Sequence, residues 1–411
     1  MTAIRTIRVW MLAALTTALL PTYAHANPVQ DLLEPQHDPA SIMPTPSSDP
    51  FYMPKPGFEA RPPGSLLSVR VAGGLFPTAR SLELLVRSTD SHDQPVPVVT
   101  TLLLPNAAWK GPGPRPLVSY NIPISSVGHT CAPSAELKRG ISADFLAIQM
   151  LLAKNYAVVI PDHQGPRQAY AAGLMGGHAV LDSIRAVTRT PMPGLSPATP
   201  VVLTGYSGGA IATAWAAQLA PSYAPEIRLA GSIVGGGPSD FRLLLPRMDG
   251  VNFASGVLLA AALGLAREYP ELLTLLNDNG WRVAKLFRDI CIAQETQLGV
   301  IAPLRIDQLS NVPEPTKLPM VQRILDQNRP GAVAPTAPVF IFHGVHEIWI
   351  PYEGARHLFD EWCARGARVR LQPFPGEHFL VGALSIPLTN GWIDQLLAGR
   401  LVPPGCTGPG H

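Results

Sequence analysis

The sequence has few charged residues, and the two signs nearly balance. Only 15% of its 411 residues are charged, and the formal net charge at pH 7 is +2. A nucleic-acid-binding protein needs a clustered basic face, so we expect no nucleic-acid partner. The 45 prolines and the weakly charged exterior are typical of an exported protein with stiff loops.

Motifs for metal binding are also missing. The sequence contains neither C-x-x-C nor H-E-x-x-H, which are common spacings of metal ligands. We therefore expect no metal site. Four cysteines in an exported chain predict two disulfides, and four cysteines allow three pairings.

Long hydrophobic runs are absent after the N-terminus. Residues 1–26 contain two early arginines, an apolar stretch over 9–20 and the site Ala24-His25-Ala26, which predicts a secretory signal cleaved before Asn27. The alternative is an uncleaved anchor. The next most apolar stretch, 253–266, is too short to cross a bilayer and favours a buried helix. We expect a secreted protein without a transmembrane span.

The mature chain alternates strand and helix patterns. Alternating and β-branched runs over 66–104 predict antiparallel strands at one edge of a sheet. Strand patterns at 116–120, 156–160, 201–204 and 229–234 are separated by helical stretches. This alternation predicts a mostly parallel central sheet flanked by helices on both faces, with functional residues at the carboxyl ends of its strands.

The alternation stops over residues 238–335, which show helical periods and no clear strand. Strand patterns resume at 338–342 and 369–374. We interpret the interruption as a helical cap inserted between two parts of one domain, residues 27–237 and 336–411. A separate C-terminal helical domain is excluded because the sheet continues afterwards.

One motif points to chemistry. Gly205-Tyr206-Ser207-Gly208-Gly209 reads G-x-S-x-G, follows a strand pattern and opens a small-residue helix. That context predicts a nucleophile elbow, in which a strained turn exposes the serine oxygen. The alternative is an ordinary glycine-rich connection from strand to helix. We expect Ser207 to be a nucleophile, beside N–H groups at a helix N-terminus.

A serine nucleophile needs a base, and the base needs an acid to orient it. In this arrangement the chain order is serine, acid, histidine. His378 follows the last predicted strand, in the loop 375–379, and is the expected base. Glu347 is the only carboxylate between residues 343 and 352 and is the expected acid. Asp240, one strand earlier, is the alternative.

An oxyanion intermediate needs two N–H donors. We expect the first from the backbone of Gly208, the residue after the nucleophile. The second should come from the loop 121–126, after the strand that ends at Tyr120, with Ser125 as our candidate.

Four blocks of residues occur in order along the chain. They are Val118-Ser119-Tyr120 with Cys131-Ala132-Pro133-Ser134, Pro161-Asp162-His163-Gln164-Gly165-Pro166 with Ala169-Tyr170-Ala171-Ala172-Gly173, Gly177-His178-Ala179-Val180-Leu181-Asp182, and the G-x-S-x-G motif. Together these blocks resemble the secretory lipase family, the lipase A type of yeasts and bacteria. The resemblance runs from about Leu117 to His378 and implies an α/β-hydrolase with a helical cap that hydrolyses fatty-acid esters without a cofactor. By that match Ser207, Glu347 and His378 are the nucleophile, acid and base.

Two positions depart from the family pattern. Glu347 stands where the pattern G-x-x-D-x-x-V-P has aspartate, and Ile124-Ser125 stands where relatives tend to carry an acidic pair. The second change affects the oxyanion loop and leaves the reaction class unchanged.

We expect a secreted serine ester hydrolase, a triacylglycerol lipase or carboxylesterase that forms an acyl-enzyme on Ser207 and takes lipid or ester substrates at a lipid–water interface. Alternatives are an acyltransferase or peptidase on the same fold, because fold and triad do not fix the leaving group, and a non-catalytic binding protein. The expected disulfides are Cys131–Cys291, tying the oxyanion side to the cap, and Cys363–Cys406. The apolar stretch 257–265 is expected to line an acyl channel or to pack within the cap.

Overall fold

The computed structural model describes residues 37–73, 76–400 and 405–409, so the expected signal peptide lies outside the described residues. Within these ranges, ten strands form one sheet in the order β1-β2-β3-β5-β4-β6-β7-β8-β9-β10. Pairing is antiparallel from β1 to β5 across the edge and parallel from β5 to β10, as the sequence predicts except for the added β10. The strands are Leu66–Val71, Ala79–Thr89, Pro95–Pro105, Leu117–Asn121, Ala157–Pro161, Val201–Tyr206, Leu229–Gly235, Val339–Gly344, Val369–Phe374 and Cys406–Thr407 for β1 to β10.

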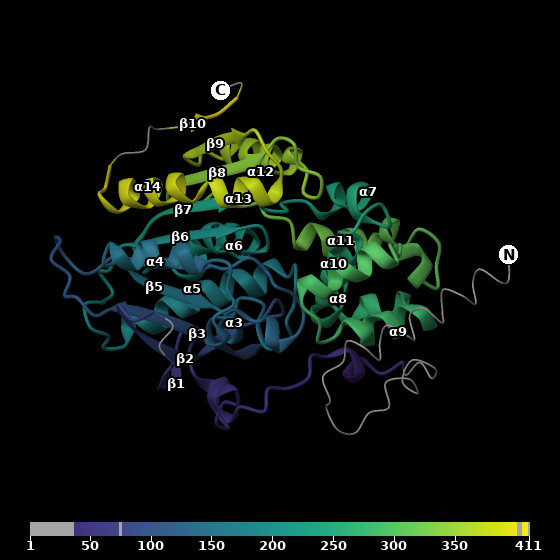
Figure 1. The fold of residues 1–411 in the computed structure, drawn as a ribbon, viewed down its shortest axis with the longest axis horizontal. Coiled ribbons are helices and arrows are strands. Elements are labelled where there is room, and N and C mark those ends of the chain that lie inside the picture. Colours follow the sequence, from purple (N-terminus) through teal and green to yellow (C-terminus); the bar gives the residue numbers. More distant parts are fainter. Residues whose placement is uncertain (1–36, 74–75, 401–404, 410–411) are drawn as a thin grey trace.

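Helices cover both faces of the sheet (Figure 1). Helices α5, α6 and α12 pack on one face, and α3, α4 and α14 on the other. Apolar side chains that recur every three or four residues, as in Val180, Leu181 and Ile184 of α5, are fully buried against the strands. These helices are α3 Pro133–Arg139, α4 Phe145–Ala153, α5 Gly173–Arg189, α6 Gly208–Tyr223, α12 Tyr352–Ala364 and α14 Ile386–Leu397; the short α13, His378–Leu384, follows β9.

The described chain between β7 and β8 contains helices and no strand. This helical insertion lies together on one side of the sheet (Figure 1). Residues 283–292 have a helical period in the sequence, which predicts one helix. They belong to two helices, because Cys291 adopts an extended N-cap conformation and forms a disulfide to Cys131. The helices are α7 Leu245–Met248, α8 Ser255–Glu268, α9 Asp278–Phe287, α10 Ile292–Ile301 and α11 Pro319–Gln327.

One apolar cluster joins the insertion to the sheet domain. It includes Ile124 and Val127 from the loop after β4, Trp349 from the loop after β8, and many residues of α8. Ile42 of the N-terminal segment is fully buried in the same cluster. The segment that precedes β1 therefore contributes to the core.

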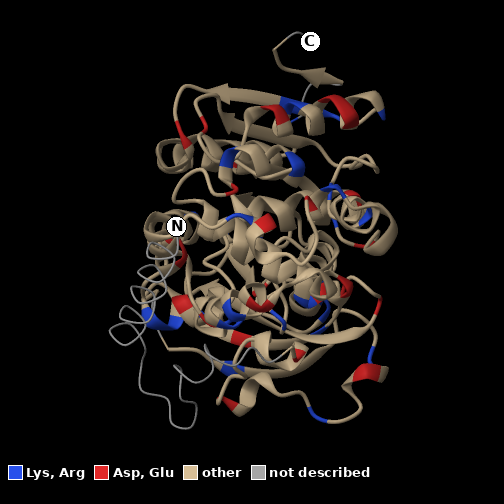
Figure 2. Ribbon diagram, turned by 90° about the vertical axis from the view of Figure 1, so that its right-hand side faces the viewer, with Lys and Arg blue, Asp and Glu red and all other residues tan. Residues whose placement is uncertain are grey.

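In the view of Figure 2, Lys and Arg residues are interspersed with Asp and Glu residues over the described ribbon. In the described part of the chain, no helix is long and apolar enough to span a membrane.

Candidate active site

The turn around Ser207 is sterically demanding. Strand β6 ends at Tyr206, Ser207 has φ 54° and ψ −123°, and α6 begins at Gly208. A side chain at Gly205 would bring its Cβ within 2.4 Å of the Gly209 carbonyl oxygen, and one at Gly209 would come within 2.0 Å of the Asn121 carbonyl oxygen. Both flanking glycines are therefore required by close backbone approach, because a nucleophile elbow leaves no space for a Cβ there.

Three predicted site residues form one hydrogen-bonded chain. His378 Nε2 lies 2.8 Å from Ser207 Oγ, and His378 Nδ1 lies 2.6 Å from Glu347 Oε1. His378 and Glu347 are buried, at 3% and 8% exposure, whereas Ser207 is partly exposed. The arrangement has the geometry of a nucleophile, a base and an orienting acid.

His378 is the first residue of α13, whereas the sequence places it within a loop. The carboxylate of Glu377 caps this helix by accepting bonds from the backbone N–H groups of Phe379 and Leu380. Glu377 is therefore the N-cap residue and does not bond the ring of its neighbour.

The loop that carries Glu347 is bonded to the chain that precedes His378. The N–H of Val345 donates to the Phe374 carbonyl at 2.9 Å, and that of His346 donates to the Gly376 carbonyl at 3.1 Å. On the far side of the loop, His343 Nε2 lies 2.8 Å from the carbonyl oxygen of Ile350, and burial lowers the pKa of this imidazole. These bonds fix the acid and the base relative to each other.

The alternative acid, Asp240, lies at the start of a 3-10 helix, Phe241–Leu243. Its carboxylate accepts from the backbone of Arg242 at 3.0 Å and forms ion pairs with Arg242 and Arg329. These contacts belong to the insertion and do not involve His378.

Two contacts of His378 were not predicted. The hydroxyl of Tyr206 donates to the backbone carbonyl of His378 at 2.5 Å, and the ring of Trp349 stacks on the imidazole with centroids 5.7 Å apart. Tyr206 is the variable residue of the G-x-S-x-G motif, and Trp349 is two residues after Glu347. Their proximity in sequence to predicted site residues could have marked both residues as candidates. The sequence does not show, however, that their side chains point toward His378.

The loop after β4 reaches the elbow, as expected. A Cβ at Gly208 would lie 2.6 Å from Ile124 Cβ and 2.9 Å from Ile124 N, so Ile124 lies against the N-terminus of α6. The carbonyl of Ser125 accepts a bond from the N–H of Ile292 in α10 at 2.8 Å. The sequence identifies this loop but not Ile124, the residue in closest contact with Gly208.

The block that begins at Pro161 supports this loop. His163 Nε2 lies 2.9 Å from the carbonyl oxygen of Ile122, and Gln164 Nε2 donates to the carbonyl of Ser126 at 3.3 Å. Asp162 accepts from both the N–H and the hydroxyl of Ser134, at 2.8 and 2.6 Å. Burial raises the pKa of Asp162 to about 7. Residues of this block therefore hold the loop after β4 in place through hydrogen bonds to its backbone.

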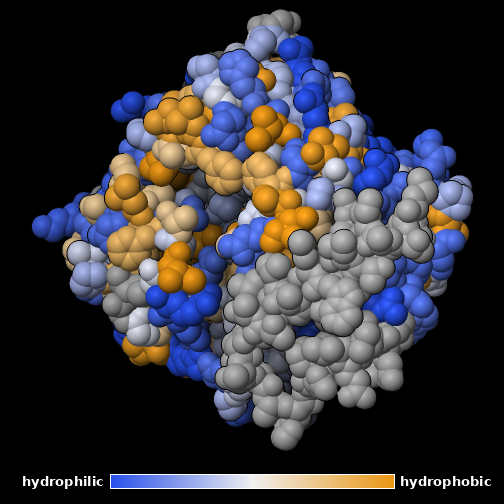
Figure 3. Space-filling model, turned by 45° about the vertical axis from the view of Figure 1, so that its right-hand side comes forward, coloured by the Kyte–Doolittle hydropathy of each residue, from blue (hydrophilic) through white to orange (hydrophobic). Residues whose placement is uncertain are grey.

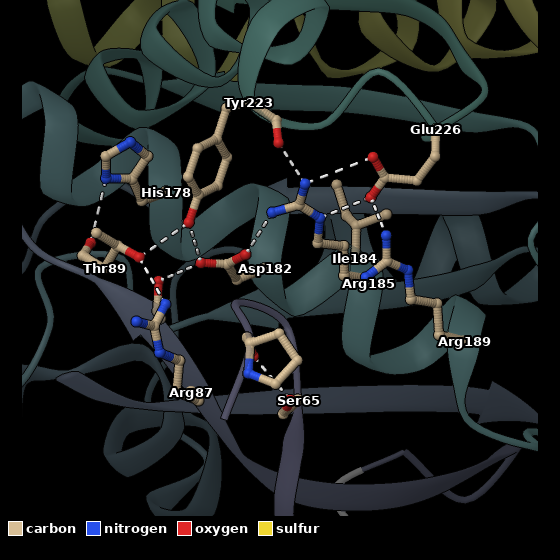
Figure 4. Close-up of polar contacts among 12 residues, drawn as sticks. Ser65, Arg87, Thr89, His178, Asp182, Ile184, Arg185, Arg189, Tyr223 and Glu226 are labelled. Atoms are coloured by element: carbon tan, nitrogen blue, oxygen red, sulfur yellow. Dashed lines mark hydrogen bonds and ion pairs between the residues drawn. The ribbon is translucent and has the colours of Figure 1, made fainter. Parts of the chain in front are cut away.

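The block around His178 lies elsewhere (Figure 4). Asp182, which is fully buried, accepts bonds from the hydroxyls of Ser88 and Tyr223 at 2.8 Å each and pairs with Arg185 at 3.0 Å. His178 Nδ1 lies 3.2 Å from the carbonyl oxygen of Thr89. This polar network fastens the end of β2 to α5 and α6 and does not reach Ser207.

The disulfides have the predicted pairing. Cys131 is joined to Cys291, which links the chain after the oxyanion loop to α10, and Cys363 is joined to Cys406, which links α12 to β10. Among the described residues, no group of three His, Cys, Asp or Glu side chains has a metal-binding arrangement.

The chain is similar in sequence to known lipases. The secretory lipase family model matches residues 133–403. A Mycobacterium tuberculosis protein named "Probable inactive lipase MT1628" is 32% identical over 373 residues, covering 86% of this chain and 83% of its own. Secreted triacylglycerol lipase LIP1 of Malassezia furfur is 32% identical over 407 residues, covering 91% and 80%.

Solved structures give the same assignment. Candida antarctica lipase A in its closed state superposes with a TM-score of 0.81 at 28% identity, covering 90% of this chain and 91% of that one. The Xanthomonas oryzae esterase LipA, at a TM-score of 0.67 and 17% identity, covers 83% of this chain and all of its own, and shares the fold. The protein has the α/β-hydrolase fold, and the chain belongs to the secretory lipase family.

Proposed function

We propose that this protein is a secreted serine hydrolase of carboxylic esters, with Ser207 as nucleophile, His378 as base and Glu347 as the orienting acid. The single observation that carries the proposal is the continuous hydrogen-bonded chain from Ser207 Oγ through both ring nitrogens of His378 to Glu347 Oε1. Family membership supplies the reaction class, and a secreted lipase or esterase is what the relatives support.

In this mechanism Ser207 Oγ attacks the acyl carbon while His378 Nε2 takes the hydroxyl proton. Glu347 holds the Nδ1–H tautomer and stabilises the imidazolium. The oxyanion lies at the N-terminus of α6, where Gly208 N–H is one donor and the loop Ile124–Ser126, with Ser125 as the predicted residue, supplies the second. His378 then protonates the leaving alcohol, and water hydrolyses the acyl-enzyme by the same steps in reverse.

For the substrate, we propose triacylglycerols or similar lipid esters taken from a lipid–water interface. Five large apolar side chains are 43–64% exposed within a few residues of the acid and base. They lie on the loop after β8 and on α13, which begins at His378: Val345, Ile348, Phe379, Leu380 and Leu384. We call this set the apolar rim.

Apolar residues also gather around a hollow on the side of the molecule where the insertion meets the sheet (Figure 3). We propose that the insertion, residues 238–335, acts as a cap over the acyl site. Within it, Gly264 of α8 packs so closely on Tyr170 that a Cβ would come within 2.3 Å of the Tyr170 nitrogen. Gly264 is therefore a packing position, and Ala261, which is partly buried, is the better probe of an acyl channel.

A non-catalytic protein is the alternative that one relative's name raises. The intact chain of hydrogen bonds at Ser207 argues against it, because a binding protein has no need of an oriented base. A peptidase or acyltransferase on this fold would use the same triad, and no contact at the site favours either.

A fluorophosphonate probe and Ser207→Ala test the proposal. Wild-type protein should become labelled at Ser207 and hydrolyse p-nitrophenyl esters, and the variant should lose about 10⁴–10⁶ in kcat with its fold intact. Peptide mapping that locates the label on another residue would refute the nucleophile assignment. Hydrolysis of a peptide substrate in preference to esters would refute the substrate class.

A further inference from the structure

The helical insertion buries a carboxyl that the proposed mechanism does not use. Glu295, in the first turn of α10, has no exposed surface, and neither of its carboxyl oxygens has a hydrogen bond of good geometry. The hydroxyl of Ser126 faces it and is likewise buried without another partner. Burial raises the pKa of Glu295 well above its usual range, against the opposing effects of Ser126 and Arg267.

Ser126 belongs to the loop that supplies the second oxyanion donor. It is fully buried, and its φ of 116° is unusual for a residue with a side chain. Its backbone forms an antiparallel bridge with Cys291, directly before α10, and the neighbouring carbonyl of Ser125 is bonded to Ile292. A strained residue persists only where its surroundings hold it in place.

A second side chain of the insertion holds the same loop. Arg267 of α8, only 1% exposed, donates to the carbonyl of Val127 at 2.7 Å and to the carbonyls of Ile42 and Arg288 at 2.9 and 2.7 Å. Burial lowers the pKa of Arg267 to about 9. Helices α8 and α10 are in close contact, since a Cβ at Gly256 would lie 1.9 Å from the carbonyl oxygen of Glu295. The two helices therefore form one support beside the loop.

Stability alone does not account for a carboxyl at position 295. Burying a polar group without a well-formed partner destabilises a fold, and an apolar side chain of similar size would avoid that cost. What the carboxyl provides is a buried polar group that faces the otherwise unpartnered hydroxyl of Ser126. Ser126 is two residues after Ile124, which lies against Gly208. Glu295 is therefore connected to the oxyanion site through this loop.

We propose that Glu295 is a positioning residue for ester hydrolysis, which acts through Ser126 to hold the Ile124–Ser126 loop in the conformation that presents its oxyanion donor. The proposal rests on the proposed function of Ser207 and of this loop. It gives the insertion a role in the transition state in addition to covering the substrate.

The test uses a soluble ester, p-nitrophenyl butyrate, and four single variants of the full-length protein. Glu295→Ala and Ser126→Ala should each lower kcat about tenfold, less than the 10²–10³ that loss of an oxyanion donor costs, and leave KM within about twofold. Glu295→Gln keeps a donor and an acceptor at that place and should retain kcat. Glu268→Ala is the matched control, because Glu268 is a buried glutamate of α8 that pairs with Arg167 and not with the loop.

The double variant Glu295→Ala/Ser126→Ala should lose no more kcat than either single variant, because both remove one shared interaction. Unchanged kcat in Ser126→Ala, equal loss in Glu268→Ala, or loss confined to KM would overturn the positioning role. Ser126→Ala removes one hydroxyl and tests the contact even if Glu295→Ala does not fold. Wild-type protein that neither hydrolyses the ester nor reacts with a fluorophosphonate would instead refute the proposed function itself.

Discussion

Glu347 Oε1 lies 2.6 Å from His378 Nδ1, although the glutamate follows β8 and the histidine begins a helix after β9. The resemblance described above implies aspartate at this position, and glutamate is longer by one methylene. The contact is nevertheless within hydrogen-bonding distance, and two backbone bonds between the loops hold it. The longer acid is thus accommodated without loss of the geometry that orients the imidazole.

Substitution of the two candidate acids tests this relationship. Glu347→Gln should lower kcat about 10³–10⁴-fold, because an amide stabilises the wrong tautomer of His378 and no imidazolium charge. Asp240→Asn should keep kcat near the wild-type value, since its contacts are with Arg242 and Arg329. Steady-state kinetics on p-nitrophenyl butyrate at equal folded concentration measures both. The reverse ranking of the two variants would move the acid to Asp240.

The apolar rim should matter for aggregated substrate only. Leu380→Ser/Leu384→Ser should reduce hydrolysis of emulsified triolein about fivefold or more, because each exposed leucine contributes roughly 1.5–3 kcal/mol when fully buried in an apolar phase. Hydrolysis of dissolved p-nitrophenyl acetate should not change. Val71→Ser, on the edge strand β1, removes an equally exposed apolar side chain and serves as the control. A loss of the same size on both substrates would argue against an interface-binding role.

The disulfide between Cys131 and Cys291 should contribute more to stability than the one between Cys363 and Cys406. The two close loops of 160 and 43 residues, and the chain-entropy model gives about 5 and about 4 kcal/mol. Paired replacement of each by alanine, followed by urea unfolding, measures the difference. Only the first pair anchors the oxyanion side to α10, so its removal should also lower kcat at temperatures where the protein stays folded. Equal kcat in both variants would contradict that anchoring role.

Asp162 should make stability fall as the pH rises. Burial raises its pKa from 3.8 to about 7, so the folded state binds a proton more tightly than the unfolded state. Below about pH 4 the carboxyl is protonated in both states and costs no stability. Between about pH 4 and pH 7 the free energy of unfolding should fall by roughly 4 kcal/mol, because only the unfolded state releases the proton. Urea unfolding from pH 4 to 8 should show the wild-type value falling relative to Asp162→Asn. The neighbouring His163 is present in both proteins, so its contribution cancels in the comparison. Parallel curves of unfolding free energy against pH would show that the pKa of Asp162 is not raised.

The candidate site could be predicted from the sequence wherever the chemistry is local. The elbow is predictable because strand, glycines and helix are contiguous around Ser207. His378 is predictable because it lies in the loop directly after the last predicted strand, where the chain order requires the base. The alternating patterns likewise indicate a parallel sheet. The ends of the helices were less predictable. His378 begins a helix because Glu377 caps it. The helical period at 283–292 is interrupted before Ile292 because the disulfide holds Cys291 in an extended conformation.

Contacts between distant segments were not predictable. Tyr206 and Trp349 contact His378 through side-chain directions that no local pattern specifies. Ile124, rather than Ser125, lies against Gly208 because the loop after β4 curves over the N-terminus of α6. Glu295 and Arg267 have the types and spacing of surface residues, yet both are buried where the insertion folds back on this loop.

The sequence by itself indicated most elements of this protein and the proposed nucleophile and base, Ser207 and His378, because hydrophobic periodicity and a glycine-flanked serine act over a few residues. Only the tertiary structure decided between Glu347 and Asp240 as the carboxylate beside His378, and only it brought α8 and α10 to the oxyanion loop. Those outcomes depend on packing between segments that are not contiguous in the sequence. They depend on how the insertion and the sheet domain pack into one apolar core, and on which buried polar groups form hydrogen bonds there. Neither property can be predicted from one segment of the sequence.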